Sequence, residues 1–201
     1  MAGFGILILA GSAVSAPFEE QVSQASQALS SGALRTRQVF AASKTRRASA
    51  AQAEWQKVTA KDAVFTAEMP GAPQYGQSES QTLQGNAFTL RQYELDIDAR
   101  AFLVLTALYP ADMDVSDARA SLQGANDNAA KGLDGGKFTS VTWTTYQGYT
   151  AVEAVGVSKG VAVRAFMTLK GHQAITLIYS GPEGTTGSQD ADRFFKSLVI
   201  L

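Results

Sequence analysis

The sequence contains no cysteine and only one histidine, His172. Without cysteine the chain has no disulfides, thiolate nucleophiles, thiolate zinc sites or iron–sulfur clusters, and it cannot carry the lipid of a bacterial lipoprotein. One histidine supplies too few nitrogen ligands for an ordinary zinc site, and a Ser-His-Asp triad would have to recruit that single residue. Because His172 falls in an expected hairpin turn, we interpret it as a solvated polar residue, and we expect no cofactor.

Charge is also scarce and nearly balanced. Charged residues make up 17% of the chain and the net charge is -1, so no overall basic field attracts nucleic acid. Residues 18–51 carry 5 basic and 2 acidic residues, and residues 52–201 carry the other 12 basic and 16 acidic residues. This distribution indicates a basic tether followed by a mildly acidic domain, without a nucleic-acid partner.

An uncharged apolar segment opens the chain over residues 3–18. Its small residues around Ser15, just before Pro17, resemble the cleavage site of a secretory signal. No basic residue precedes the segment and proline disfavours the cut, so an uncleaved anchor and a buried helix remain alternatives. We expect residues 1–17 to be a signal peptide or membrane anchor, and the protein to be periplasmic or secreted, either free or anchored through residues 3–18.

The rest of the chain divides at about residue 54. Residues 18–53 are rich in Ala, Ser and Gln and poor in large apolar residues, which predicts a polar basic linker. From residue 54 to residue 201 the apolar content suits one globular domain, and a chain of this length rarely holds two.

Short apolar and β-branched runs predict strands through most of this domain. The segment 69–73 must interrupt the first of them, because neither Pro70 nor Pro73 can donate a backbone hydrogen bond. Residues 102–105 are apolar throughout, which predicts a central strand covered on both faces. The expected strands are 55–58, 63–67, 75–83 (an edge strand), 87–95 after a turn at Gly85-Asn86, 100–109, 138–146, 149–157, 161–169 and 173–179.

Two helices complete the prediction. One begins at Ser116 as its N-cap and runs to about Lys131, and the other begins at Ser188 and has its apolar stripe at Phe194 and Phe195. Glycine-containing turns between the last four strands predict an antiparallel meander. The fold class is therefore α+β, a mostly antiparallel sheet with helices packed on its faces.

The order of these features resembles the PsbP-like fold, an α-β-α sandwich found in an extrinsic photosystem protein, a Ran-binding nuclear-transport factor and many bacterial exported proteins. The resemblance rests on Trp55, the MPGAP segment at residues 69–73, the glycine-punctuated meander and the DRFFKSL segment at residues 192–198. It covers residues 54–201 and implies a non-enzymatic accessory or binding role, usually outside the cytoplasm. It carries over no binding residues, since these motifs are structural.

Few residues suggest chemistry. Asp112, Asp114 and Asp117 form the one acidic cluster, and oxygen ligands at this spacing suit calcium or magnesium. The cluster lacks the glycine and glutamate of a calcium loop, which favours a solvated loop before a helix. Tyr146 and Tyr149 flank a turn and are the candidates for contact with a partner.

We therefore expect an exported or membrane-tethered accessory or binding domain that is not an enzyme and has an unidentified protein partner in the cell envelope. The alternatives are a metal-assisted hydrolase that uses Asp112, Asp114 and Asp117, and a passive structural domain of a larger assembly. Contact with a membrane through the N-terminal segment is a further expectation.

Overall fold

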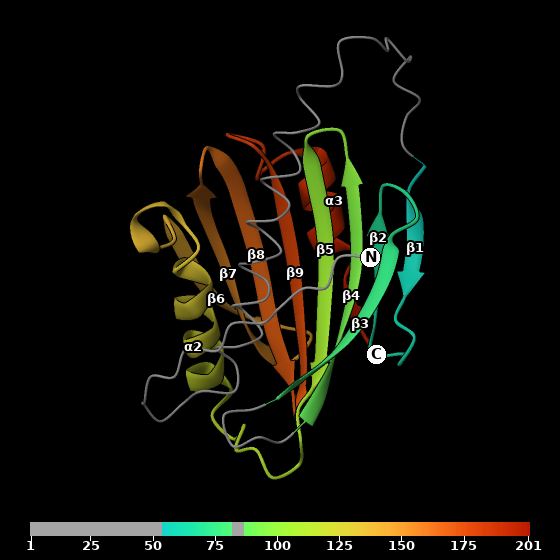
Figure 1. Cartoon of the computed structure of the whole chain (residues 1–201), viewed down its shortest axis with the longest axis vertical. Helices are drawn as coiled ribbons and strands as arrows, with labels where there is room; N and C mark the ends of the chain where they lie inside the picture. The colour runs from blue at the N-terminus through green and yellow to red at the C-terminus, as the bar shows by residue number, and fades with distance from the viewer. Residues whose placement is uncertain (1–53, 82–86) are drawn as a thin grey trace, which may run out of the picture.

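The computed structural model describes residues 54–81 and 87–201 (Figure 1). The signal or anchor expected over residues 1–17, the linker expected over residues 18–53 and the turn expected at Gly85-Asn86 lie outside the described residues. Within them, the fold is α+β and consists mostly of antiparallel strands, as the sequence predicts.

A seven-stranded antiparallel sheet forms the centre of the molecule. The strand order is β3-β4-β5-β9-β8-β7-β6, and the four consecutive strands β6 to β9 form the predicted meander. The expected edge strand is confirmed, because β3 pairs only with β4. The strands are β3 (Gln74–Gln81), β4 (Ala87–Ile97), β5 (Arg100–Leu108), β6 (Ser140–Tyr146), β7 (Tyr149–Ser158), β8 (Val161–Lys170) and β9 (Gln173–Pro182).

Two-residue turns set the register of the meander. Gln147 and Gly148 join β6 to β7 with φ of 50° and 87°, and Lys159 and Gly160 join β7 to β8 with φ of 53° and 78°. Positive φ at both turn residues matches the right-handed twist of the strands. Each turn therefore places the residues on either side of it in direct cross-strand pairs.

The predicted central strand is β5. Phe102 and Val104 face one side of the sheet, Leu103 and Leu105 face the other, and all four side chains are buried. The apolar run is continuous because both faces of the sheet are covered at this strand.

A second, three-stranded sheet has the order β1-β2-β10. Its strands are β1 (Gln56–Thr59), β2 (Phe65–Met69) and β10 (Val199–Ile200). The chain leaves this sheet at Pro70 and enters the large sheet at β3. The predicted break in the strand is therefore confirmed, but it begins at Pro70, because Met69 still belongs to β2. The pairing of β10 with β2 brings the C-terminus back to the start of the domain.

The helix α2 (Ala118–Ala130) packs on one face of the large sheet, against β7 and β8. Its N-cap is Asp117, whose carboxylate accepts a hydrogen bond from the backbone N–H of Ala120 at 2.9 Å, so the prediction of Ser116 as the cap is wrong by one residue. A short 3-10 turn (Asp134–Gly136) follows. The α2-side cluster comprises Phe88, Leu90, Leu103, Leu105, Ala107, Tyr109, Leu122, Ala125, Ala129, Leu133, Val152, Val163, Ala165, Met167, Leu169, Ala174 and Ile178.

The helix α3 (Gln189–Lys196) contacts β2 and lies on the other face, behind β5 and β4 in Figure 1. Ser188 caps it as predicted, and Phe194 and Phe195 are buried. The α3-side cluster comprises Val58, Ala60, Phe65, Ala67, Met69, Tyr93, Phe102, Val104, Ala151, Phe166, Ile175, Leu177, Tyr179, Ala191, Phe194, Phe195 and Leu198.

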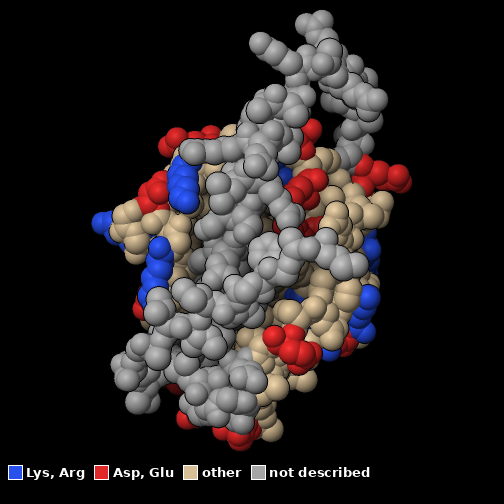
Figure 2. Space-filling view, viewed as in Figure 1, with Lys and Arg blue, Asp and Glu red and all other residues tan. Residues whose placement is uncertain are grey.

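The face of the molecule in Figure 2 shows basic and acidic side chains intermixed around its outline. Over the described residues on this face, neither sign gathers into a continuous patch, in keeping with the small net charge of the chain. No helix within residues 54–81 and 87–201 has the length and apolar character needed to cross a bilayer.

Candidate functional site

The acidic residues before α2 are engaged in local structure. Asp114 accepts the backbone N–H of Ser116 at 2.9 Å, and hydrogen bonds from the side chain and backbone of Ser116 lower the pKa of Asp114 below its ordinary value. Asp117 caps the helix. In the described part of the chain, no three acidic, histidine or cysteine side chains are grouped as a metal site would require. The geometry gives this loop a role in starting α2.

His172 lies in the turn between β8 and β9, where the sequence places it. Its backbone carbonyl accepts the N–H of Tyr109 at 3.0 Å, which ties the turn to the end of β5. The imidazole is half-buried, and its Nδ1 has no hydrogen-bond partner among the described residues. The structure thus gives the backbone of His172 a structural role.

Tyr146, one of the two predicted contact residues, fastens the C-terminus to the large sheet. Its hydroxyl donates to the carbonyl of Leu198 at 2.6 Å, and its ring packs edge-on against Phe166 with centroids 5.1 Å apart. The amide of Gln147 donates to the same carbonyl at 3.0 Å and accepts the N–H of Ile200 at 3.0 Å. The β6–β7 turn therefore binds the backbone just before β10, at Leu198, and within β10, at Ile200.

Replacing Tyr146 with phenylalanine should lower the free energy of unfolding by about 0.5–1.5 kcal/mol, the net value of one hydrogen bond. The ring keeps its packing, so only the bond to Leu198 is lost. Chemical denaturation measures the change, and Tyr149→Phe is the matched control, because no hydrogen bond of the Tyr149 hydroxyl occurs within the described residues. Equal losses in the two variants would contradict the structural role of the Tyr146 hydroxyl.

Tyr149 is half-exposed and makes a looser contact. The ammonium of Lys170 lies 5.7 Å from its ring centroid, near the outer limit of a cation–π contact. The two tyrosines form the directly opposed pair that closes the β6–β7 hairpin. Contact of either residue with a partner stays a prediction.

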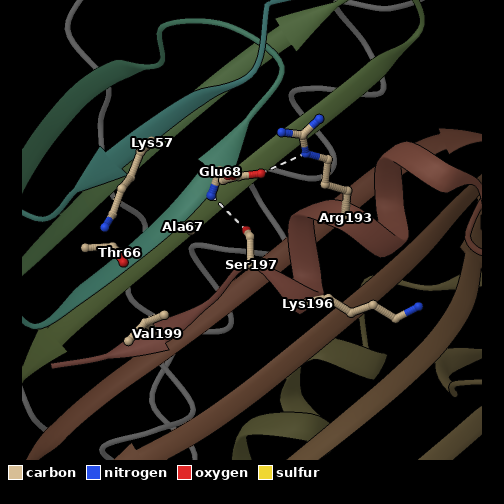
Figure 3. Close-up of a pocket in the computed structure, with 8 residues that line it drawn as sticks. All are labelled: Lys57, Thr66, Ala67, Glu68, Arg193, Lys196, Ser197 and Val199. Atoms are coloured by element: carbon tan, nitrogen blue, oxygen red, sulfur yellow. Dashed lines mark hydrogen bonds and ion pairs between the residues drawn. The ribbon is translucent and has the colours of Figure 1, made fainter.

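An open groove with a volume of about 400 Å³ lies between β2 and the end of α3 (Figure 3). The carboxylate of Glu68 lies 2.7 Å from Nε of Arg193, and the backbone N–H of Glu68 donates to the hydroxyl of Ser197 at 2.7 Å. The Ser197 hydroxyl in turn donates to the carbonyl of Phe194 at 2.7 Å. Ser197 thus provides a hydrogen-bond acceptor for the backbone N–H of Glu68, which lies beyond the residues of β2 that pair with β10.

The charges that line this groove are largely balanced. Arg193 pairs with Glu68 and lies 4.4 Å from the ring centroid of Trp55, and Lys196 pairs with Asp192 at 2.6 Å and points away from Glu68 in Figure 3. Cations in the last turn of a helix also offset the negative end of its dipole. Only Lys57, among the cations that line the groove, has no ion pair with another described residue. The contacts of Glu68 with Arg193 and Ser197 therefore hold the end of α3 against β2.

The strand β6 is the exposed edge of the large sheet and pairs only with β7. Its sequence, SVTWTTY, contains no charge, no proline and no glycine. Most of its side chains are exposed, including Val141 at 41%, while Trp143 is half-buried under the guanidinium of Arg119, 4.3 Å from the ring centroid. Proteins usually protect such an edge with charges, proline or a bulge inside the strand.

The outer edge of β6 offers backbone hydrogen bonds at three positions. A two-residue turn places Tyr146 and Tyr149 in a hydrogen-bonded pair, so alternate residues of β6 bond to β7 and the residues between them face outward. Val141, Trp143 and Thr145 are the outward residues, and no backbone bond links them to another described element. The Thr145 carbonyl has only a long contact, 3.5 Å from the Thr144 hydroxyl.

The other strand edges are less suited to pairing. The edge strand β3 carries the acidic Glu79 and begins directly after Pro73, and the short β1 carries the exposed Lys57. The strand β10 is only two residues long. Among the described strands, β6 is thus the longest uncharged edge. The sequence analysis predicted this strand but not its place at an edge. After α2 the chain could return to the sheet beside β5 with any strand of the meander, and the structure shows that β9 pairs with β5, which leaves β6 at the edge.

Comparison with known proteins gives a likeness in fold. No protein-family model matches the chain, and no curated protein matches it. Among similar solved structures is cyanobacterial PsbP (CyanoP) from Synechocystis, with 12% identity and a TM-score of 0.46, covering 79% of this chain and 99% of that one. This similarity to a solved PsbP structure supports the PsbP-like fold that the sequence resembles. At this TM-score the similarity carries no argument about activity, ligand or partner.

Two further structures are more distant. A protein from Bacteroides thetaiotaomicron has 13% identity and a TM-score of 0.42, covering 73% of this chain and 48% of that one. A protein of unknown function from Pseudomonas aeruginosa, PA94, has 13% identity and a TM-score of 0.34, covering 66% of this chain and 86% of that one. Neither bears on the site, so the site has to be argued from the chain itself.

Proposed function

We propose that this chain is a non-enzymatic binding domain, exported or tethered to a membrane, that holds an extended segment of a partner protein along β6. The observation that carries the proposal is the uncharged outer edge of β6, with its outward N–H and C=O groups at Val141, Trp143 and Thr145. An extended segment that adds to this edge gains main-chain hydrogen bonds, and alternate side chains give it specificity.

The wider architecture supports this proposal. With α2 on one face of the large sheet and α3 with the small sheet on the other, we interpret the domain as a PsbP-like α-β-α sandwich. Both faces are occupied at the centre of the sheet, which leaves its edges for contact. The apolar segment 3–18 supports export or anchoring, and the polar residues 18–53 would give a tethered domain reach.

Location can be tested by fractionating cells that express the full chain and measuring its intact mass in each fraction. A periplasmic species that begins near Pro17 would establish export, and a full-length species in the membrane fraction would establish an anchor. Full-length protein confined to the cytoplasm would contradict the proposed location and leave the β6 edge to be tested separately.

Binding at β6 can be tested with a photo-crosslinking amino acid at position 144 in the full chain. The matched control carries the same amino acid at position 108, since Leu108 is an exposed residue of a different strand, β5. A partner held along β6 should crosslink from position 144 and should not crosslink from position 108, and the crosslink from position 144 should weaken when Thr142 is replaced by lysine. Equal crosslinking from both positions would contradict the proposal.

A further inference from the structure

We infer that the segment that adds to β6 is β6 of a second copy of this chain, so that two seven-stranded sheets join across a two-fold axis. This inference rests on the proposed use of the β6 edge and names its partner. A two-fold interface requires a surface complementary to itself, and an antiparallel strand pair meets that condition when its register allows hydrogen bonds on both sides.

The register of β6 allows such pairing. The outward residues are Val141, Trp143 and Thr145, so the axis can pass through Trp143. Val141 then lies opposite Thr145 of the second copy, and Trp143 lies opposite its own counterpart. Each of these pairs exchanges two backbone bonds, about six in all. All outward groups of the strand are used, which no shifted register achieves.

The side chains suit the same register. Thr142 lies opposite Thr144 of the second copy, and Thr–Thr pairs are favourable across antiparallel strands. No like charges meet within the strand, because it has none. The two Trp143 side chains lie on the same face of the joined sheet, each beside its own Arg119. Glu79 on β3 and Lys57 on β1 would instead put like charges near each other if those edges paired with their own copies.

The interface is small, so we expect a reversible dimer. Seven residues on each side bury less than the roughly 1,200 Å² of a standard interface. About six backbone hydrogen bonds have to offset the loss of translational and rotational freedom. Association should therefore be weak and concentration-dependent, and sedimentation equilibrium over a range of protein concentrations measures it.

The test uses the full chain and three double variants at exposed positions of β6. Thr142→Lys/Thr144→Lys puts two lysines opposite each other at both ends of the pair and should raise the dissociation constant about tenfold. Thr142→Glu/Thr144→Glu should do the same, and an equal mixture of these two variants should associate again. Thr142→Lys/Thr144→Glu places opposite charges across the axis and should dimerise at least as tightly as the parent chain.

The outcomes separate this inference from the proposed function. Unchanged association in the double-lysine variant would overturn it, because the contact would then lie elsewhere on the chain. Weak association of Thr142→Lys/Thr144→Glu would overturn the register centred on Trp143. A parent chain that stays monomeric, while position 144 still crosslinks to a different protein, would overturn the inference and leave the binding function in place. Far-UV circular dichroism verifies that each variant is folded.

Discussion

Replacing Phe102 with alanine should lower the free energy of unfolding by about 3–5 kcal/mol, the range for a fully buried phenylalanine. Phe102 is 0% exposed, and its ring makes edge contacts with three others: Trp55 at 6.3 Å, Tyr179 at 5.3 Å and Phe194 at 5.4 Å. These rings come from the start of the domain, from β9 and from α3. The substitution leaves a cavity where the two sheets and the helix meet, and it removes three aromatic pairs.

Chemical denaturation of the full chain measures this loss, and Leu108→Ala is the matched control. Leu108 lies on the same strand, is also apolar and is 55% exposed, so its truncation should cost no more than about 0.5 kcal/mol. A loss below about 2 kcal/mol for Phe102→Ala would contradict a shared aromatic core between the two sheets. Phe102→Leu, which keeps most of the volume, should fall between the two.

The same residue shows why much of the fold could be predicted. Phe102 lies in the longest purely apolar stretch of a strand, and such a stretch needs cover on both faces. The turns of the meander were predictable for a similar reason. Two-residue hairpin turns need positive φ, and Gly148, Gly160 and Gly171 supply it. These features are local, so sequence alone can reveal them.

What sequence analysis missed depends on partners distant along the chain. Val199 and Ile200 form a strand only because β2 accepts them, more than a hundred residues earlier. Asp117 and Ser116 are both good caps, and the choice between them depends on where the loop from β5 enters α2. The hydroxyl of Tyr146 bonds to a carbonyl 52 residues away, a contact that the position of Tyr146 beside a turn does not reveal, while its contact with a partner stays a prediction.

The position of β6 at the sheet edge is another feature that depends on residues distant along the chain. The strand itself was predicted from its Thr, Val and aromatic residues, which favour sheets. Its position at the edge follows from strand order, which periodicity does not reveal. The absence of charge over residues 140–146 was visible in the sequence, and it becomes informative only when the strand is known to lack a second neighbour.

Arg164 joins three parts of the α3 side of the molecule. Its guanidinium lies 2.8 Å from Glu153 on β7 and 2.7 Å from Asp192 on α3, and it donates to the carbonyl of Thr186 at 3.1 Å. It also lies 4.4 Å from the ring centroid of Phe195. Because its side chain is only 12% exposed, this arginine should fix the start of α3 against β8.

Replacing Arg164 with methionine should therefore lower the free energy of unfolding at neutral pH by about 2–3 kcal/mol, since methionine keeps some packing but removes the ion pair with Glu153 and leaves Asp192 paired with Lys196 alone. Arg193→Met is the control, because Arg193 likewise contacts a ring and a carboxylate, but only one carboxylate, and it is 48% exposed. We expect about 1 kcal/mol or less there. Equal losses of unfolding free energy in the two variants would contradict the larger contribution expected from the more buried and doubly paired Arg164.

The effect of Arg164 on stability should also depend on pH. Hydrogen bonds from Lys196 and then from Arg164 lower the pKa of Asp192 in the folded protein, so folding favours the ionised carboxyl. That contribution is complete above the unfolded pKa of about 3.9 and is lost as the pH falls through the lower folded value. The gap in unfolding free energy between the parent and Arg164→Met should therefore be widest near neutral pH and narrow below about pH 4. Parallel stability curves down to acid pH would show that Arg164 acts through packing alone.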